Sequence, residues 1–326
     1  MRDSVRCGAM QEVVKTLTAA NSVCVIGHVR PDADAIGSVS ALRMGLERMG
    51  KDAVGVVGQR HPIPEALFSI PGAEEIEVIG TLPQGYDLYV TVDCGDLSRT
   101  GSVATEIAKL ADAGRVICID HHASNAGFGS INLMDYEAES TTVVLYSLLE
   151  ALKVPLDRNI AHALYAGLVT DTGSFRWGQP KMHRLAEELL HFGLDPKQIA
   201  VDLLDSLTAD DLQMLGRVLA QVSLVDAGRF KLAILVADHD VIAHYSDHAV
   251  EFLVDYVRAL RGTDMGVVFK EQAPGYWATS LRSSAINCAD IATLLGGGGH
   301  IPAAGYLTTG SLPEIVDELV AVVSTL

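Results

Sequence analysis

The sequence has no long apolar run. None of its hydrophobic segments approaches the ~18 residues that a membrane-spanning helix needs. The first residues, MRDSVRCGAMQEVV, lack the apolar centre of a secretory signal. We therefore expect a cytoplasmic protein without a membrane partner.

Cysteine is scarce and irregularly placed. The chain has five cysteines, an odd number, and no two of them have the CxxC spacing of structural zinc sites. This pattern argues against a disulfide framework and against a thiolate metal site. Cysteines within strand-like apolar runs are expected to act as small core residues.

Basic residues are also few. Lys and Arg number 24 against 41 Asp and Glu, which gives a formal net charge of -17. Proteins that hold long nucleic-acid duplexes neutralise the phosphates with many Lys and Arg side chains, so a long duplex is not an expected partner. Solvated acidic surface would account for most of the negative charge, and a carboxylate cluster for divalent cations would account for part of it.

Low-complexity tracts and internal repeats are absent, and the length of 326 residues favours two domains of ~100–200 residues each. In the first half, short β-rich runs alternate with helical patterns, which predicts an α/β fold with a mainly parallel sheet. A helical stretch from 193 to 224 without a strand signal is followed by a smaller α/β unit. We predict a first domain at 1–192, a helical connector at 193–228 and a second domain at 229–326. The strand candidates of the first half are 22–27, 52–57, 75–79, 87–92 and 115–119.

Polar side chains follow the first of these strand candidates. The run SVCVIG leads directly into His28, Asp32 and Asp34, and open α/β sheets bind ligands outside the carboxyl ends of their strands. Either Asp34 or Ser38 caps the helix that follows, or the aspartates bind metal. This segment alone leaves both interpretations open.

Two further strand candidates end in residues of the same kind. Asp93 follows YVTV, and Asp120, His121 and His122 follow VICI. A single aspartate at a strand end is usually a turn residue, but three such ends in one sheet predict a shared metal site. Asp171, in GLVTDTGSF, joins this set although its segment is also ordinary helix-ending sequence. Carboxylates with imidazoles suit Mn²⁺ and also permit Mg²⁺, Co²⁺ or Fe²⁺.

Four motifs in this order give the chain a family resemblance. HxRPDxD (28–34), VD (92–93), DHH (120–122) and TDT (170–172) resemble the motifs of the DHH phosphoesterase superfamily. LRSS (281–284) and GGGGH (296–300) resemble parts of its DHH-associated C-terminal domain. The resemblance implies an N-terminal parallel-sheet domain, a smaller C-terminal α/β domain and a cleft between them.

The resemblance also implies two metal ions, Mn²⁺ by preference. Two cations about 3.5 to 4 Å apart would activate a bridging hydroxide for in-line attack on phosphorus and neutralise the charge that develops. Asp120 would orient a neighbouring histidine, and His122 would face the scissile phosphate as a general acid unless it is a spare ligand or a structural histidine. The implied ligands are His28 and Asp32 for one ion, Asp34 and His121 for the other, Asp93 as the bridge and Asp171 to complete the shell.

A second set of residues is implied to bind the substrate. Arg282 would grip a phosphate as a planar fork, and the glycine run would offer backbone N–H groups to it, unless that run is only a flexible helix end. Arg176, in SFRW, adds positive charge near the metals or is an ordinary surface arginine. The implied substrate residues are Arg282, Ser283, Gly297, Gly298, Gly299 and His300.

Among family members the chain resembles the short, stand-alone NrnA-like group. That resemblance implies hydrolysis of short oligoribonucleotides, of 3'-phosphoadenosine 5'-phosphate, and of cyclic di-AMP and its linear product pApA, with a homodimer as a family-level expectation. A manganese-dependent inorganic pyrophosphatase is the enzymatic alternative, although the lysine- and arginine-rich phosphate site of those enzymes has no counterpart here. A catalytically silent nucleotide sensor is the other alternative, and the complete set of ligand residues argues against it.

Overall fold

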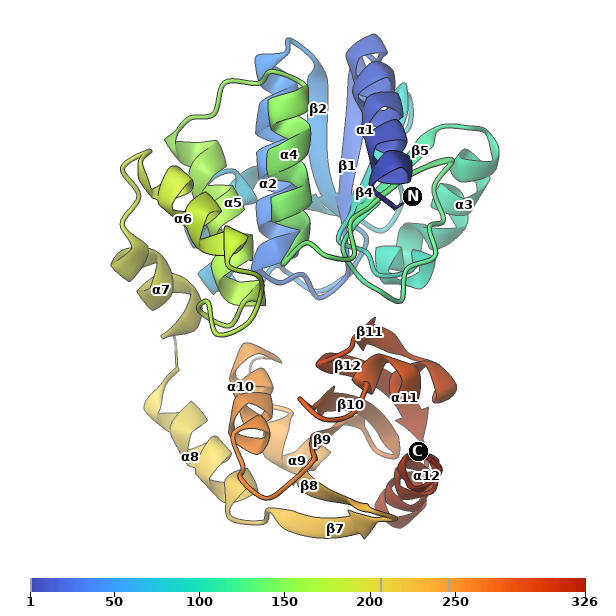
Figure 1. Ribbon diagram of the computed structural model, residues 1–326, viewed down its shortest axis with the longest axis vertical. Coiled ribbons are helices and arrows are strands. Elements are labelled where there is room, and N and C mark those ends of the chain that lie inside the picture. Colours follow the sequence, from blue (N-terminus) through green and yellow to red (C-terminus); the bar gives the residue numbers. More distant parts are fainter. Residues whose placement is uncertain (1, 206, 246) are drawn as a thin grey trace. The chain divides into compact units, whose positions relative to one another are not determined.

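The computed structural model describes residues 2–205, 207–245 and 247–326. It divides the chain into two units, Met1–Ser206 and Leu207–Leu326, which are drawn in Figure 1. The division falls inside the segment that the sequence predicts as a connector: α7 (Pro196–Leu204) belongs to the first unit and α8 (Ala209–Leu219) to the second. No helix in the described ranges is long and apolar enough to cross a membrane.

The described part of the first unit has a six-stranded sheet in the order β3-β2-β1-β4-β5-β6. Every neighbouring pair is parallel, which confirms the predicted sheet. The strand β6 was not predicted, because INLM is short and contains a polar residue, so it has no clear apolar pattern. The strands are β1 (Ser22–Gly27), β2 (Asp52–Val57), β3 (Ile76–Val78), β4 (Leu88–Val92), β5 (Val116–Asp120) and β6 (Ile131–Met134).

The strand order reverses between β1 and β4. From β1 the chain builds β2 and β3 on one side, and then returns to place β4 on the other side of β1. In open parallel sheets, the crevice outside the carboxyl ends of two such strands is the usual ligand site. The residues that follow β1 and β4 therefore lie where a site is expected.

Helices cover both faces of this sheet. Strand β1 is buried on both sides: Val23 and Val25 join one hydrophobic core, and Cys24 and Ile26 join the other. The larger core includes α2, α4 and α5, which pack against one another and are seen together in Figure 1. The smaller core includes α3. The helices are α1 (Arg2–Ala19), α2 (Ala33–Arg48), α3 (Ala104–Asp112), α4 (Thr141–Ala151), α5 (Arg158–Asp171) and α6 (Lys181–Leu190), with 3₁₀ turns at Glu65–Ser69, Ala73–Glu75 and Leu97–Val103.

The second unit is a mixed sheet with helices on both faces. The strand order, for the residues described here, is β11-β12-β10-β9-β8-β7, and β8 and β9 are its parallel pair. One core lies under α8 and α10, and the other lies under α11 and α12. The elements are β7 (Ser223–Ala227), β8 (Phe230–Ala237), α9 (His239–Ile242), α10 (Asp247–Arg258), β9 (Met265–Ala273), β10 (Tyr276–Arg282), α11 (Cys288–Leu294), β11 (Gly298–His300), β12 (Ala303–Thr309) and α12 (Leu312–Ser324).

The hairpin of β9 and β10 confirms the sequence prediction, but β7 corrects it. The stretch up to residue 224 was expected to be wholly helical, whereas Ser223–Ala227 pairs antiparallel with β8 at the edge of the sheet. Leu224 is 60% exposed, so this edge strand lacks the buried alternation by which strands are recognised.

Candidate metal centre

The predicted metal ligands are brought together at the carboxyl edge of the first sheet. His28 follows β1 and Asp93 follows β4, on the two strands that flank the reversal in strand order. His121 follows β5, and Asp171 is the last residue of α5. Asp34 lies in the first turn of α2.

One half of the centre is built around His28. Its Nε2 lies 3.5 Å from Asp93 Oδ2 and 3.6 Å from Asp32 Oδ2. On the other side of the ring, Nδ1 lies 2.9 Å from both the Val29 carbonyl oxygen and Arg99 Nη2. The ring thus presents Nε2 to two carboxylates, which is the arrangement that a metal-binding imidazole needs.

The second oxygen of Asp32 caps a helix. Its Oδ1 accepts hydrogen bonds from the backbone N–H groups of Asp34 and Ala35, each at 3.0 Å, and Asp32 is the N-cap of α2. The sequence analysis named Asp34 or Ser38 as the possible cap of this helix. Both were wrong, because the helix already begins at Ala33. Asp32 therefore caps with one oxygen and faces His28 with the other.

The other half of the centre is built around His121. Its Nε2 lies 3.3 Å from Asp171 Oδ2, 3.7 Å from Asp93 Oδ1 and 3.9 Å from Asp34 Oδ2. Its Nδ1 lies 3.3 Å from the carbonyl oxygen of Ala138. Asp93 consequently turns one carboxylate oxygen towards each histidine, Oδ2 towards His28 in one half and Oδ1 towards His121 in the other.

Asp34 is held by the start of another helix. It is fully buried, and its two oxygens accept from the backbone N–H groups of Thr141 at 2.7 Å and Thr142 at 3.0 Å. These N–H groups belong to the first turn of α4, where the helix itself leaves them without partners and where a negative charge is favoured.

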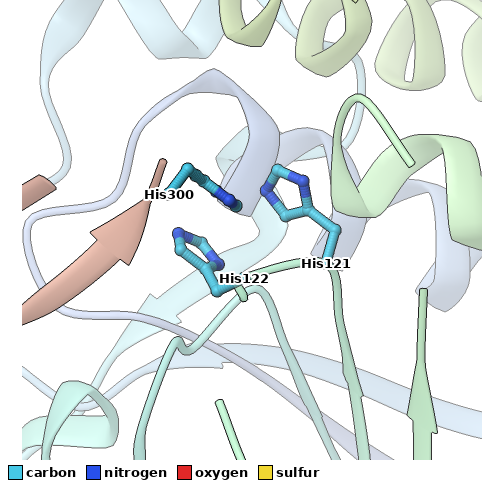
Figure 2. A group of neighbouring side chains, drawn as sticks. All are labelled: His121, His122 and His300. Carbon is cyan, nitrogen blue, oxygen red and sulfur yellow. The ribbon is translucent and has the colours of Figure 1, made fainter. Parts of the chain in front are cut away.

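Asp120 is buried and accepts several hydrogen bonds. Its Oδ1 accepts from the backbone N–H groups of His121 and His122, and its Oδ2 accepts from Gly95 N and from Asn125 Nδ2. His122 Nδ1 lies 2.7 Å from Asp120 Oδ1, so this carboxylate orients the ring. Figure 2 shows the His121 and His122 rings inclined to each other, with centroids 4.7 Å apart.

Burial and neighbouring charges shift the pKa values of several residues in the centre. Burial and the nearby Asp34 carboxylate raise the pKa of Asp93 well above its usual range, and the same two causes raise the pKa of Asp171 to about 7. Burial also raises the pKa of Asp34. For His121, burial lowers the pKa, but the hydrogen bond and charge of Asp171 outweigh it and raise the pKa well above its usual value.

These shifts have one physical meaning. Without a cation, the buried carboxylates would repel one another, and the folded protein relieves this by retaining protons. A divalent cation would do the same more effectively, because it prefers carboxylate and imidazole ligands in their deprotonated forms. The donor set therefore fits divalent metal ions. Among the described residues of this unit, the overlapping groups whose ligand atoms lie within 4.8 Å of one another are His28, Asp32 and Asp93; Asp34, His121 and Asp171; and Asp93, Asp120, His121 and His122.

The second unit holds the predicted substrate residues. Arg282 is the last residue of β10 and is half-buried, and its Nη1 donates to the Leu281 carbonyl oxygen. The Ser283 hydroxyl donates to the Asp264 carbonyl oxygen and accepts from the backbone N–H groups of Ala285 and Ile286. Those three bonds use the whole hydrogen-bonding capacity of the Ser283 hydroxyl, so in this arrangement the hydroxyl supports the loop, and a substrate role for Arg282 and Ser283 remains a prediction.

The glycine run is more ordered than a flexible helix end. Residues 298–300 form β11, which pairs with β12. A β-carbon on Gly297 would lie 2.1 Å from the Gly305 carbonyl oxygen, and one on Gly299, at φ +138°, would lie 2.6 Å from Ala304 Cα. Close packing against β12 thus explains why positions 297 and 299 are glycine, and a substrate role for Gly297, Gly298, Gly299 and His300 remains a prediction.

Arg176 lies in the first unit, in the loop after Asp171. Its Nε donates to the Gly173 carbonyl oxygen, and its guanidinium lies 5.6 Å from the centre of the Trp177 ring. Trp177 Nε1 donates in turn to the Asp171 carbonyl oxygen. The loop therefore places an exposed guanidinium within a few residues of a predicted ligand.

Sequence reasoning missed several residues around the centre: Arg99, Asn125, Thr141 and Thr142. Ser140 caps α4, so the run Ser140-Thr141-Thr142 does signal the start of a helix. Nothing in that signal connects it to Asp34, because Asp34 and Thr141 are 107 residues apart in the chain.

Comparisons with known proteins agree with the resemblance seen in the sequence. Residues 22–168 match the model of the DHH family, N-terminal domain, and residues 234–325 match the DHHA1 domain. The bifunctional oligoribonuclease and PAP phosphatase NrnA of Thermus thermophilus is 31% identical over 305 residues, 92% of this chain and 89% of the relative. A more distant relative is the cyclic-di-AMP phosphodiesterase GdpP of Geobacillus thermodenitrificans, 25% identical over 98% of this chain and 50% of its own length. Among solved structures, an exopolyphosphatase-related protein from Bacteroides fragilis has a TM-score of 0.81 and 23% identity, over 98% of this chain and 96% of that one.

Proposed function

Because the chain belongs to the DHH family as an NrnA-like phosphoesterase, we propose that it hydrolyses short oligoribonucleotides and small nucleotides with two Mn²⁺ ions at this centre. The observation that carries the proposal is Asp93, which turns one oxygen towards each of the two histidine-centred halves. The substrate class is supported by the names of the two relatives, one an oligoribonuclease and PAP phosphatase and the other a cyclic-di-AMP phosphodiesterase. A cytoplasmic location and a homodimer are part of the same proposal, and the mass in solution tests the latter.

Each predicted ligand has a place in this proposal. When bound, two divalent cations would lower the pKa of a water molecule and stabilise the negative charge on the phosphoryl oxygens. Mg²⁺ or Co²⁺ would suit the same donors. The ions would be held by His28 and Asp32, by Asp34, His121 and Asp171, and by Asp93 between them.

Two residues would act on the substrate side of the centre. Asp120 holds the Nδ1 side of His122, which leaves Nε2 as the atom that would donate a proton to a phosphoryl or leaving oxygen. In the second unit, Arg282 would bind a phosphate of the substrate, with His300, Gly298 and the backbone of Gly297 and Gly299 beside it. Arg176 would add a further positive charge.

A panel of substrates tests the proposal directly. Purified protein with Mn²⁺ is assayed in parallel on pApA, cyclic di-AMP, 3'-phosphoadenosine 5'-phosphate, a short RNA and pyrophosphate, and the products are separated by chromatography. We expect hydrolysis of one or more of the nucleotides and none of pyrophosphate. Hydrolysis of pyrophosphate alone would support the pyrophosphatase alternative, and no hydrolysis of any substrate would support a silent sensor.

The variant Asp93→Asn tests the shared carboxylate. Loss of one oxygen ligand should lower the rate on every substrate by at least about 100-fold. The fold should persist, because asparagine has the shape of aspartate and keeps an oxygen that can accept from the Thr141 hydroxyl. Circular dichroism in EDTA checks the fold. A folded variant with near-normal activity would contradict the assignment of Asp93 as the bridge.

A further inference from the structure

Two of the predicted metal ligands share one neighbour, Thr141. Its backbone N–H donates to Asp34 Oδ2 at 2.7 Å, and its hydroxyl donates to Asp93 Oδ1 at 2.9 Å. All three residues are buried, with 2% exposure for Asp93 and none for the other two. One residue therefore links a carboxylate on α2 to a carboxylate at the end of β4.

The orientation of the Asp93 carboxylate depends on a hydrogen-bond partner. Its backbone is at φ +58°, a left-handed conformation that costs energy for a residue with a side chain. Rotation about the last side-chain bond of an aspartate is soft, so the backbone alone does not decide which oxygen faces which half of the centre. A hydrogen bond to Oδ1 restricts that rotation and leaves Oδ2 towards His28.

Thr141 is itself held firmly. Ser140 is the N-cap of α4, with its hydroxyl accepting from Val143 N, and this places Thr141 at the first helical position. The N–H group of that position has no partner within its helix, so it is available to Asp34. A β-branched side chain within a helix has few rotamers, which keeps the hydroxyl on Asp93.

We propose that Thr141 is a positioning residue that sets the spacing of the Asp34 and Asp93 carboxylates and turns one Asp93 oxygen towards each metal ion. This inference rests on the proposed two-metal function. Thr141 would act through these two predicted ligands and not as a ligand itself. The role proposed for the side chain belongs to its hydroxyl. The hydrogen bond to Asp34 comes from the backbone N–H, so it remains when the side chain is changed.

The test measures Mn²⁺ binding without substrate. Thr141→Val keeps the shape and the backbone N–H but removes the hydroxyl, and Thr141→Ser restores the hydroxyl without the methyl group. Thr279→Val is the matched control: Thr279 is also buried, with 3% exposure, but it lies on β10 in the second unit, which supplies none of the predicted metal ligands. Calorimetry gives Kd and stoichiometry, and electron paramagnetic resonance reports magnetic coupling between the two Mn²⁺ ions.

We expect Thr141→Val to bind Mn²⁺ about 10 to 100 times more weakly and to lose the coupled signal. Thr141→Ser should stay within about threefold of the natural protein, because it keeps the hydrogen bond, and Thr279→Val should bind Mn²⁺ as the natural protein does. Melting temperatures in EDTA show whether each variant folds. If Thr141→Val does not fold, Thr141→Ala takes its place.

Several results would overturn the inference: an unchanged Kd and spectrum in folded Thr141→Val, a Thr141→Ser variant as weak as the valine variant, or an equal loss in Thr279→Val. If the natural protein binds no Mn²⁺, this inference and the proposed function both fail. If it binds two coupled Mn²⁺ ions, responds to the variants as expected and hydrolyses no phosphoester, the proposed function fails while the role of Thr141 is supported.

Discussion

Gly167, on α5, shows how closely residues pack around Asp34. A β-carbon at this position would lie 2.3 Å from Asp34 Oδ1 and 2.5 Å from Thr142 Oγ1. Both distances are steric clashes. Both neighbours are buried in hydrogen-bonded positions, so neither can move away freely. The glycine is therefore required by the buried carboxylate next to it.

We predict that Gly167→Ala lowers the free energy of unfolding in EDTA by about 1 to 3 kcal/mol and weakens Mn²⁺ binding, since Asp34 must move. The matched control is Gly216→Ala on the exposed side of α8, where a β-carbon would meet nothing within 4 Å. That change should stabilise the protein by about 0.5 to 1 kcal/mol, because alanine favours the helix. Urea titrations measure both effects, and equal stability of the two variants would be inconsistent with the packing argument.

At the scale of elements, several residues of each predicted functional set lie at strand ends. In the first sheet, β1, β4 and β5 deliver their ligands to one edge because all the strands are parallel. In the second sheet, β10 ends at Arg282, beside β9 and β12, where it pairs with Gly266 and Ala303. A residue at the end of a central strand is held by two neighbours, and this gives Arg282 a well-defined position.

For Arg282→Ala we expect KM for nucleotide substrates to rise about 10-fold or more, as one charged hydrogen-bonding group is lost. Hydrolysis of a small artificial phosphodiester should change less, because that substrate lacks the second phosphate. Arg282→Lys serves as the control that keeps the charge without the planar fork. Equal losses on both substrates would show that Arg282 supports the structure or acts in the chemical step.

At the scale of the whole molecule, the candidate metal centre should couple the free energy of unfolding to pH. The pKa values of Asp34, Asp93, Asp171 and His121 are all raised in the folded protein. A group with a raised folded pKa binds protons that the unfolded chain does not, so its stabilising contribution is lost as pH rises through the folded value. Because the pKa of Asp171 is raised from 3.8 to about 7, the metal-free protein should lose stability as the pH rises from about 4 to about 7.

Divalent cations should reverse this trend, since they bind the deprotonated ligands and bind them more tightly as pH rises. We expect saturating Mn²⁺ to raise the melting temperature by more at about pH 8 than at about pH 5. Differential scanning calorimetry with Mn²⁺ and with EDTA at both pH values measures the difference. The same gain at both values would show that proton release from these carboxylates is not linked to metal binding.

The residues that form the centre could be anticipated to different extents. His28, Asp93 and His121 follow short apolar runs. The end of a strand can be recognised from an apolar pattern about six residues long. Asp171 required the family resemblance, because its segment has the pattern of any helix end. Thr141 was not foreseen, because the contact that reveals it is with a distant part of the chain. The strand β7 was not foreseen for another reason: it pairs with the next strand, but its exposed residues lack a buried alternation.

The sequence by itself determined the α/β class and the chemical types of the metal donors, because both depend on short patterns of neighbouring residues. Only the tertiary structure decided that β4 lies beside β1, that Asp93 shares its two oxygens between His28 and His121, and that Thr141 reaches both Asp34 and Asp93. These features depend on which distant segments pack together, and the free energy of that packing comes from the buried core as a whole.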